Sequence, residues 1–255
     1  MNSNGEFKMR LDVYLTENNL CKSRAAAQSL ITGGGVCVNG KPVQKNSLEI
    51  TEHDEVSVVE EKLPRYVGRG GLKLEKALEL WEIDLSGKTC LDIGASTGGF
   101  TDRMLQSGAA RVFAVDVGSG QLDEKLRFDS RVISLEQTDI REFSFDNFEG
   151  IDSADFIGTD VSFISLKLIL PHIFRLLKVG GEAVALIKPQ FEAGQKSLSK
   201  KGIVRDEKTR LKIVEEIKQF ALQCGFSVVG TADSPITGGS GNIEYLIMLR
   251  KGERK

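Results

Sequence analysis

Strand-like and helix-like patterns alternate along this chain from residue 72 to its end. Short apolar runs are separated by longer stretches in which apolar residues recur at helical spacing. The strands expected from these runs cover residues 89–93, 111–116, 132–136, 155–160, 182–188, 226–232 and 244–250. The expected helices cover residues 72–81, 99–108, 165–177 and 206–224. Such alternation is typical of an α/β protein with a mainly parallel sheet, and the nearly adjacent last two strands suit an antiparallel final strand.

The first sixty residues carry a different and more compact pattern. Ser23 is expected to cap a helix that runs from Arg24 to Ile31, and the three glycines at 33–35 are expected to end it. Asn39-Gly40 lies between two short apolar runs and predicts a tight β-hairpin. The expected boundaries are 1–61 for a small α+β domain, 62–71 for a linker rich in proline and glycine, and 72–255 for the α/β domain.

The composition excludes several classes of protein. The four cysteines form no C-x-x-C pair and the two histidines are far apart, so neither a disulfide framework nor a metal site is expected. The first residues, Met1 to Glu6, lack the apolar core of a signal peptide, and no stretch approaches the ~18 apolar residues of a membrane span. We therefore expect a cytoplasmic protein with reduced thiols, and the sequence leaves its oligomeric state open.

The net charge of −2 hides a segregation of basic residues. Residues 1–46 carry six Lys and Arg against three acids, and residues 195–212 carry seven against two. Such clusters either bind nucleic-acid phosphates or form an ordinary solvated surface, and here we favour RNA. The expected RNA-binding residues are Arg10, Lys22, Arg24 and Lys41 in the small domain, Arg65 and Arg69 in the linker, and Lys200, Lys201 and Arg205 in the second basic segment.

A glycine-rich loop follows the first strand of the α/β domain. Its spacing, Gly94-x-x-x-Gly98-Gly99, matches neither the G-x-G-x-x-G of dinucleotide folds nor a phosphate loop, which needs a following Lys-[Ser/Thr]. Acids on two successive strands, Asp92 and Asp116, suit S-adenosylmethionine instead, because its amino group and ribose hydroxyls need acceptors. Asp139 is either a contact for the adenine edge or a surface acid. The expected cofactor-binding residues are Asp92, Gly94, Ala95, Ser96, Gly98, Gly99, Phe100, Asp116 and Asp139.

Four charged residues are expected together at the edge of the sheet where open α/β folds bind ligands. Asp160 and Lys188 end two strands, Lys73 opens the first helix of the domain, and Glu244 opens the last strand. Two lysines and two carboxylates balance in charge, which a partly dry pocket tolerates better than a lone lysine. Methyl transfer to a ribose hydroxyl needs a neutral base, and burial beside a second cation favours a neutral lysine. We assign the base to Lys188, held by Asp160, while Glu244 and Lys73 orient the ribose.

Motifs in both parts of the chain resemble known families. Arg10-Leu11-Asp12, Lys22-Ser23-Arg24 and Val38-Asn39-Gly40 resemble the αL RNA-binding motif of a small-subunit ribosomal protein, many pseudouridine synthases and tyrosyl-tRNA synthetases. In the larger part, four segments look like the haemolysin-A-like TlyA family of ribosomal RNA methyltransferases. These segments are Asp92 to Phe100, Asp160 to Phe163, Ile187 to Glu192 and Asn242 to Glu244.

The second resemblance implies a fold, a reaction and a site. It implies a Rossmann-like methyltransferase sheet of seven strands, the last antiparallel, similar to that of the FtsJ-type 2′-O-methyltransferases. It implies S-adenosylmethionine as the methyl donor and a cytidine 2′-hydroxyl in ribosomal RNA or ribosomal subunits as the acceptor. The catalytic tetrad of FtsJ-type enzymes maps onto Lys73, Asp160, Lys188 and Glu244. The chain departs from the FtsJ pattern at Thr97 and Phe100, where those enzymes often have proline and tryptophan.

Two other functions are compatible with parts of the pattern. A non-catalytic RNA-binding protein of ribosome assembly would keep the fold, but the intact glycine loop and charged tetrad argue against it. A membrane-active haemolysin is suggested by the family's name. The sequence has neither an apolar span nor a cationic amphipathic tail with which to act on a membrane.

Overall fold

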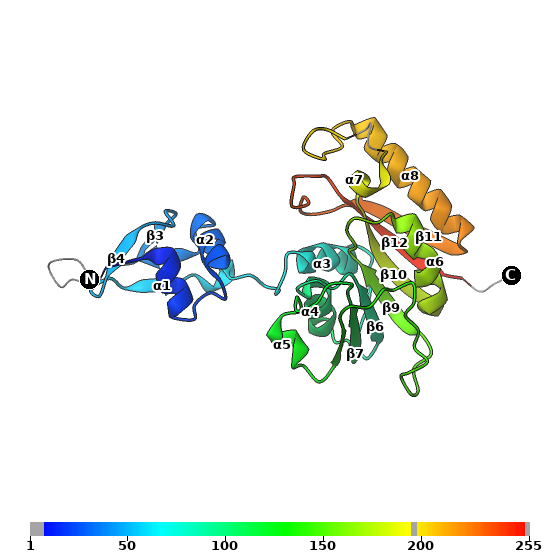
Figure 1. Ribbon diagram of the computed structural model, residues 1–255, viewed down its shortest axis with the longest axis horizontal. Helices are drawn as coiled ribbons and strands as arrows, with labels where there is room; N and C mark the ends of the chain where they lie inside the picture. The colour runs from blue at the N-terminus through cyan, green and yellow to red at the C-terminus, as the bar shows by residue number, and fades with distance from the viewer. Residues whose placement is uncertain (1–7, 195–197, 253–255) are drawn as a thin grey trace. The chain divides into compact units, whose positions relative to one another are not determined.

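The computed structural model describes residues 8–194 and 198–252. The chain forms two compact units, Met1–Arg65 and Tyr66–Lys255, and each is described by itself (Figure 1). The prediction about Met1 to Glu6 falls outside the described residues, and so does Lys196 of the second basic segment.

The small unit packs two helices against two short sheets. Its elements are β1 (Lys8–Arg10), α1 (Leu11–Glu17), α2 (Arg24–Thr32), β2 (Val36–Val38), β3 (Lys41–Val43), β4 (Glu49–Thr51), β5 (Val56–Val58) and the 3₁₀ helix η1 (Glu60–Lys62). β2 pairs antiparallel with β3 and β5, and β1 pairs antiparallel with β4. The buried core consists of Leu11, Leu15, Ala27, Leu30, Ile31, Val36, Val38 and Ile50.

Local sequence explains the helix and the hairpin that were predicted in this unit. Ser23 Oγ accepts a hydrogen bond from the backbone N–H of Ala26 at 3.2 Å, so Ser23 is the N-cap of α2. Asn39 and Gly40 have φ angles of 52° and 72°, the left-handed values that a two-residue turn between β2 and β3 needs. Both local predictions are confirmed.

The large unit is built on one seven-stranded sheet. Its strands are β6 (Thr89–Ile93), β7 (Arg111–Val115), β8 (Val132–Leu135), β9 (Ala154–Thr159), β10 (Leu177–Ile187), β11 (Phe226–Asp233) and β12 (Tyr245–Lys251). They lie in the order β11-β12-β10-β9-β6-β7-β8. β12 runs antiparallel to both neighbours, whereas the pairs from β10 to β8 are parallel. This topology confirms the predicted α/β sheet with an antiparallel last strand.

Helices cover both faces of the sheet (Figure 1). They are α3 (Gly70–Leu80), α4 (Gly99–Gln106), α5 (Glu124–Arg127), α6 (Leu166–Leu176), α7 (Pro189–Glu192) and α8 (Glu207–Gln223). Successive strand residues face opposite sides. Cys90 lies in one core with Leu74 of α3, and Leu91 lies in the other with Ile173 of α6 and Ile217 of α8. Burial on both faces explains why the inner strands, such as β7 and β10, are nearly continuous apolar runs.

The structure differs from the predicted elements at short or irregular segments. α3 begins at Gly70, and Tyr66, which lies in the expected linker, is buried against Gly71 as part of the large unit. β10 begins at Leu177, before the predicted start, but its regular pairing with β9 begins at Glu182. α5 and α7 have four residues each, too few to show helical periodicity in the sequence.

Within the part of the chain that the structure describes, no helix is both long enough and apolar enough to cross a membrane. The same described residues contain no group of three or more His, Cys, Asp or Glu side chains that could hold a metal ion.

Candidate active site

The predicted site residues meet where the strand order of the sheet reverses. β6 lies between β7 and β9, so the loops that follow these strands diverge at its carboxyl end. The backbone N–H of Asp160 donates to Ile93 O at 3.1 Å, and that of Gly94 donates to Val115 O at 2.9 Å. These bonds extend the ladder by one residue and hold the loops side by side. Open α/β sheets bind ligands at such a switch point.

The four predicted catalytic residues form one connected charge cluster. Lys73 Nζ lies 3.1 Å from Asp160 Oδ2 and 2.8 Å from Glu244 Oε2. Lys188 Nζ lies 2.6 Å from Asp160 Oδ1. Asp160 therefore bridges the two lysines, while Lys73 bridges the two carboxylates.

Sheet topology brings these residues to the same edge. Asp160 follows β9 and Lys188 follows β10, so both leave the sheet at its carboxyl end. β12 is antiparallel to β10 and pairs Tyr245 with Ile187, so Glu244 precedes β12 at the same edge. Lys73 lies in the first turn of α3, which covers this part of the sheet.

Burial makes the charge balance of the cluster important. Lys73, Lys188 and Glu244 are 7%, 8% and 3% exposed, so each charge needs a partner. Burial alone would raise the pKa of Asp160, but the positive charges of Lys188 and Lys73 outweigh it and lower that pKa. Asp160 is therefore ionised at neutral pH and can hold both lysines.

Two residues that the sequence argument did not select also belong to the cluster. Ser162 Oγ accepts a hydrogen bond from Lys188 Nζ at 2.9 Å. Gln190 Nε2 donates to Glu244 Oε1 at 3.2 Å, and Gln190 Oε1 is buried without a hydrogen-bond partner among the described residues. Each follows a tetrad member by two positions, a spacing that by itself does not distinguish it from other polar residues of these loops.

The glycines of the predicted cofactor loop have a packing role as well. Gly94 and Gly98 adopt φ angles of 81° and 95°, which side chains rarely tolerate. A Cβ at Gly94 would lie 3.0 Å from the carbonyl oxygen of Asp160, and one at Gly98 would lie 2.2 Å from Leu126 Cδ1. Both glycines are predicted from the sequence to bind the cofactor. In the structure they also let the loop approach the chain's own backbone and α5.

Asp92 is a buried acid at the base of this loop. Its Oδ2 accepts hydrogen bonds from the backbone N–H and the hydroxyl of Thr101, at 2.9 and 2.6 Å. Its Oδ1 is buried and has no hydrogen-bond partner among the residues that the structure describes. Burial raises the pKa of Asp92 to about 7, with smaller contributions from the charges of Asp160 and Asp116, although the bonds from Thr101 oppose the shift. Asp92 can therefore be neutral or charged near pH 7.

Asp116 and Asp139, two predicted cofactor-binding acids, line one cavity beside the loop. Asp116 Oδ2 accepts from the backbone N–H of Ser96 at 2.8 Å, and its Oδ1 accepts from that of Gly118 at 2.8 Å. Asp139 is paired with the guanidinium of Arg141, whose hydrogen bonds hold the pKa of Asp139 below its usual range. Both acids border one cavity of about 460 Å³.

Two cavities share walls along the loop. The second has about 200 Å³ and is lined by predicted cofactor residues together with tetrad members, including Gly94, Ser96, Phe100, Asp160 and Lys188. The two cavities share Gly94, Ser96, Asp160 and Ser162. They provide a groove with Asp116 at one end and the charged cluster at the other. The carboxylates of Asp116 and Asp160 in its walls suit a ligand with amino and hydroxyl donors, as S-adenosylmethionine has.

A third cavity, of about 410 Å³, opens on the other side of the tetrad. Lys73, Lys188 and Glu244 line it, and Ser162 borders all three cavities. Phe163 lies at its border with 91% of its surface exposed and a φ of 64°. The Phe163 ring centroid lies 5.1 Å from that of Phe191, which also lines the cavity.

The predicted RNA-binding residues lie in both units. Arg10, Lys22, Arg24, Lys41 and Arg65 are exposed in the small unit, and Arg69, Lys200, Lys201 and Arg205 are exposed in the large one.

The second basic segment borders the third cavity. Lys201 of this segment lines that cavity. Arg69, which lies in the expected linker, donates from Nη2 to Thr237 O at 3.0 Å. One of the seven basic residues counted in residues 195–212, Arg210, is not available at the surface. It is buried and donates to Val204 O at 3.1 Å and to the hydroxyl of Tyr245 at 3.2 Å, so it is not a surface cation.

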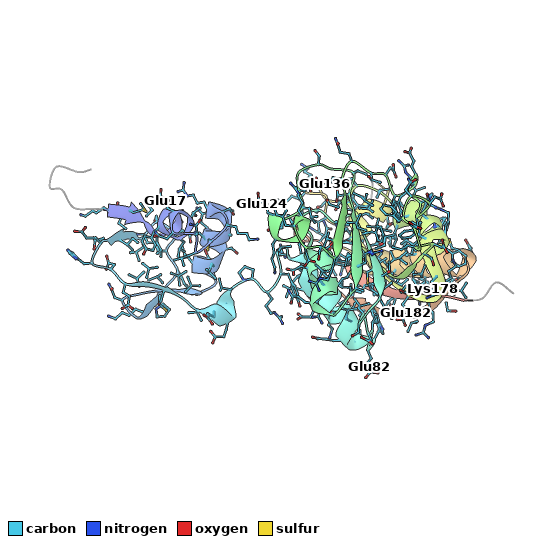
Figure 2. The ribbon with its side chains drawn as sticks, turned by 90° about the horizontal axis from the view of Figure 1, so that it is seen from below. Glu17, Glu82, Glu124, Glu136, Lys178 and Glu182 are labelled. Carbon is cyan, nitrogen blue, oxygen red and sulfur yellow. The ribbon has the colours of Figure 1, made fainter. Side chains whose placement is uncertain are left out.

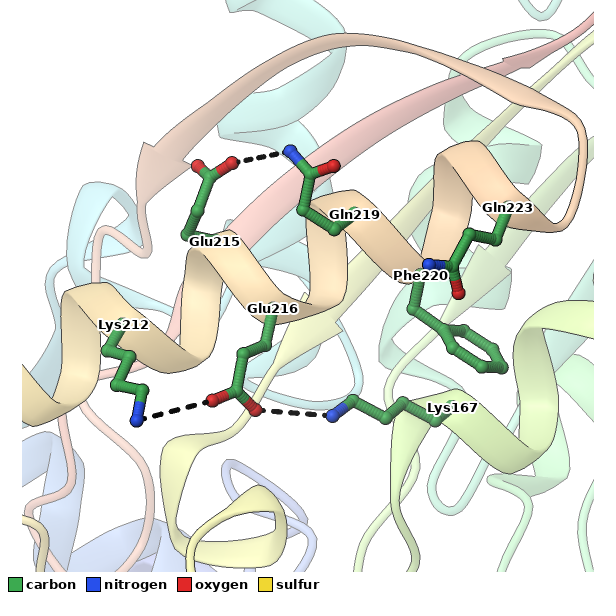
Figure 3. A pocket seen from close by; sticks show the side chains of 7 residues that line it. All are labelled: Lys167, Lys212, Glu215, Glu216, Gln219, Phe220 and Gln223. Carbon is green, nitrogen blue, oxygen red and sulfur yellow. Dashed lines mark hydrogen bonds and ion pairs between the residues drawn. The ribbon is translucent and has the colours of Figure 1, made fainter.

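A separate groove of about 380 Å³ lies between α6 and α8 (Figure 3). Glu216 lies between Lys167 and Lys212 there, 3.2 and 3.9 Å from their Nζ atoms. None of the residues that line this groove is a predicted site residue, and each of its charges is paired: Lys167 and Lys212 with Glu216, and Glu215 with Lys218.

Known proteins share this architecture and sequence. Hemolysin A of Brachyspira hyodysenteriae is 45% identical over 93% of this chain and 98% of its own length. The 16S/23S rRNA (cytidine-2′-O)-methyltransferase TlyA of Mycobacterium tuberculosis is 39% identical over 95% of this chain and 90% of its own length. The solved structure of a hemolysin-like protein from Streptococcus thermophilus covers 96% of this chain and 89% of its own, with 46% identity and a TM-score of 0.75.

Two family descriptions match the two units. The S4 domain matches residues 9–56, within the small unit. The FtsJ-like methyltransferase family matches residues 66–251, which includes the whole sheet and the four residues of the charge cluster. This chain therefore belongs to the FtsJ-like methyltransferases and carries an S4 domain ahead of the catalytic one.

Proposed function

We propose that this protein transfers a methyl group from S-adenosylmethionine to the 2′-hydroxyl of a cytidine in ribosomal RNA. The observation that carries the proposal is the cluster of Lys73, Asp160, Lys188 and Glu244 at the junction of the loop cavities and the third cavity. The name of the Mycobacterium relative suggests cytidine in ribosomal RNA as the acceptor. Such a substrate implies a cytoplasmic protein.

The groove along the glycine loop would hold the cofactor. Asp116 would accept hydrogen bonds from the ribose hydroxyls, and Asp139 would border the adenine edge. The loop from Gly94 to Gly99 would enclose the amino-acid end. Asp92, buried beneath the loop, would support it through its hydrogen bonds from Thr101. When bound there, S-adenosylmethionine supplies an electrophilic methyl group next to the charged cluster.

The cluster would prepare the ribose for attack. In its neutral form, Lys188 Nζ would accept the proton of the 2′-hydroxyl, while Asp160 and Ser162 fix its position from two directions. Lys73 and Glu244 lie on the other side of Asp160 and orient the ribose in the third cavity. Alignment of the attacking oxygen with the methyl group is expected to supply much of the rate.

Aromatic and basic side chains near the cavity suit a nucleotide substrate. A phenylalanine that is 91% exposed loses apolar contact with water when a base stacks on it, so Phe163 and Phe191 would form the stacking surface. Lys201 in the cavity wall would contact a phosphate, and the arginines of the small unit would contact other phosphates of the RNA.

Methylation of purified ribosomal subunits tests this proposal. Subunits from cells that lack this protein are incubated with it and with methyl-labelled S-adenosylmethionine, and the label is mapped by mass spectrometry of nuclease digests. We expect the label on the ribose of a cytidine. Label on a base, or retention of labelled cofactor without transfer to either subunit, would refute the proposed reaction.

A further inference from the structure

One buried carboxylate in the small unit contacts two of the arginines expected to bind RNA. Asp12 is fully buried, and its Oδ1 accepts a hydrogen bond from Arg10 Nε at 2.9 Å. Its Oδ2 accepts from Arg10 Nη2 at 3.0 Å, from Arg24 Nε at 3.0 Å and from Gln28 Nε2 at 2.7 Å. Asp12 thus joins the start of α1 to the first turn of α2.

The two arginines remain accessible although they are anchored. The side chains of Arg10 and Arg24 are 43% and 55% exposed. Arg24 contacts Asp12 through Nε, which leaves its terminal nitrogens available for another acceptor. A guanidinium binds phosphate best through two parallel N–H bonds, so its orientation matters as much as its charge.

The negative charge of Asp12, taken by itself, would weaken RNA binding. The hydrogen bonds from Arg10 hold the pKa of Asp12 well below its usual range, so the carboxylate is ionised at neutral pH. A negative charge beside two cations lowers the attraction of the surface for phosphates. A role in RNA binding must therefore come from the order that Asp12 imposes on the arginines.

We propose that Asp12 is a positioning residue for RNA binding, which holds the guanidinium groups of Arg10 and Arg24 in the orientation that grips the RNA phosphate backbone. The proposal rests on the proposed function, because it requires that the small unit binds RNA. Asp12 is thus expected to strengthen RNA binding, although its negative charge by itself would weaken it.

The test compares two variants of the full chain that remove one negative charge each from α1. Asp12→Asn removes the anchor, and Glu17→Gln removes an exposed carboxylate from the end of the same helix (Figure 2). Affinity for a ribosomal RNA fragment is measured in about 0.1 M salt. We expect Glu17→Gln to bind as tightly as the wild type or slightly more tightly. Asp12→Asn should bind about tenfold more weakly, the loss that one charge-assisted contact gives. Equal affinity of the two variants would overturn the proposal.

Two further measurements separate positioning from unfolding and from failure of the proposed function. Hydrogen exchange of the α1 and α2 amides reports whether Asp12→Asn keeps the small unit folded. If Asp12→Asn unfolds the small unit, the RNA affinity of Arg24→Lys is the test instead. In that variant Asp12 keeps Arg10 and Gln28 as partners, and the positive charge at position 24 is kept. Wild-type affinity of Arg24→Lys would then overturn the proposal. Undiminished affinity of a double Arg10→Ala, Arg24→Ala variant would instead show that the small unit does not bind RNA through these residues.

Discussion

The assignment of Lys188 as general base makes a quantitative prediction. Lys188→Ala removes the Nζ that lies 2.6 Å from Asp160 and 2.9 Å from Ser162. Proton removal by a positioned base contributes about 10²- to 10⁴-fold to a rate, or about 3 to 5 kcal/mol of activation free energy. Lys188→Arg keeps a cation beside Asp160, but a guanidinium stays protonated and cannot accept the proton. Both variants should therefore lose methyl transfer by at least about 10²-fold.

The fold should survive this substitution. Asp160 keeps Lys73 at 3.1 Å, so no buried carboxylate is left without a cation. Removal of one partner from a satisfied polar group costs about 1 to 3 kcal/mol, against a total stability of about 5 to 15 kcal/mol for a typical domain. Cofactor and RNA affinity should stay within a few-fold of the wild type.

Single-turnover methylation of ribosomal subunits at saturating cofactor is the assay. Lys178→Ala is the matched control, because Lys178 lies at the start of the same strand and pairs with Asp155 at 3.0 Å, outside the cluster (Figure 2). The control should react at the wild-type rate. A Lys188→Arg variant with a rate near that of the wild type would refute the role as base and leave Lys188 only a positive charge.

Three other substitutions test the rest of the site. Asp116→Ala should weaken S-adenosylmethionine binding by about 10- to 100-fold, the cost of one or two lost hydrogen bonds. Unchanged affinity in calorimetry would show that the cofactor does not bind in this groove. The pKa of Asp92 is raised to about 7, so the folded state binds the Asp92 proton more tightly than the unfolded chain does. Protonation of Asp92 therefore stabilises the fold fully below about pH 4, and this stabilisation is lost as the pH rises through 7. Asp92→Asn should remove up to about 4 kcal/mol of that pH dependence, and parallel curves of melting temperature against pH for the two proteins would contradict the shift. Phe163→Ala should leave the melting temperature unchanged, because the ring is exposed. The same substitution should weaken RNA binding by about 1 to 3 kcal/mol, because a base can no longer stack on the ring. A KM for ribosomal subunits equal to that of the wild type would contradict the stacking role.

Local pattern was sufficient for the strands of the large sheet, for its longer helices and for part of the site. The apolar runs predict the inner strands because burial on both faces leaves each of them apolar along most of its length, whereas the edge strand β11 alternates between covered and exposed residues. Asp160 and Lys188 are recognisable as site residues because they are the first charged residues after two such runs. The cap at Ser23 and the turn at Asn39-Gly40 depend on neighbours only a few residues away. Each of these features follows from short-range stereochemistry, which a sequence displays directly.

Tertiary structure decided the partners of those residues. Lys73 contacts Asp160 across 87 residues and Glu244 across 171, and these contacts depend on the register of β12 against β10 and on the packing of α3. The same dependence explains why Ser162 and Gln190 were not selected: each is an ordinary polar residue until the fold places it beside the cluster.

Tertiary structure also decided which charged residues are buried. Arg210 counted as a surface cation by composition, but carbonyl groups and the hydroxyl of Tyr245 bind it in the interior. Asp12 is one acid in a basic segment by sequence, yet the packing of α1 on α2 makes it the shared acceptor of two arginines. Sequence shows which charges are present. Their energies depend on distance and on exclusion of water, and only the folded chain sets those two quantities.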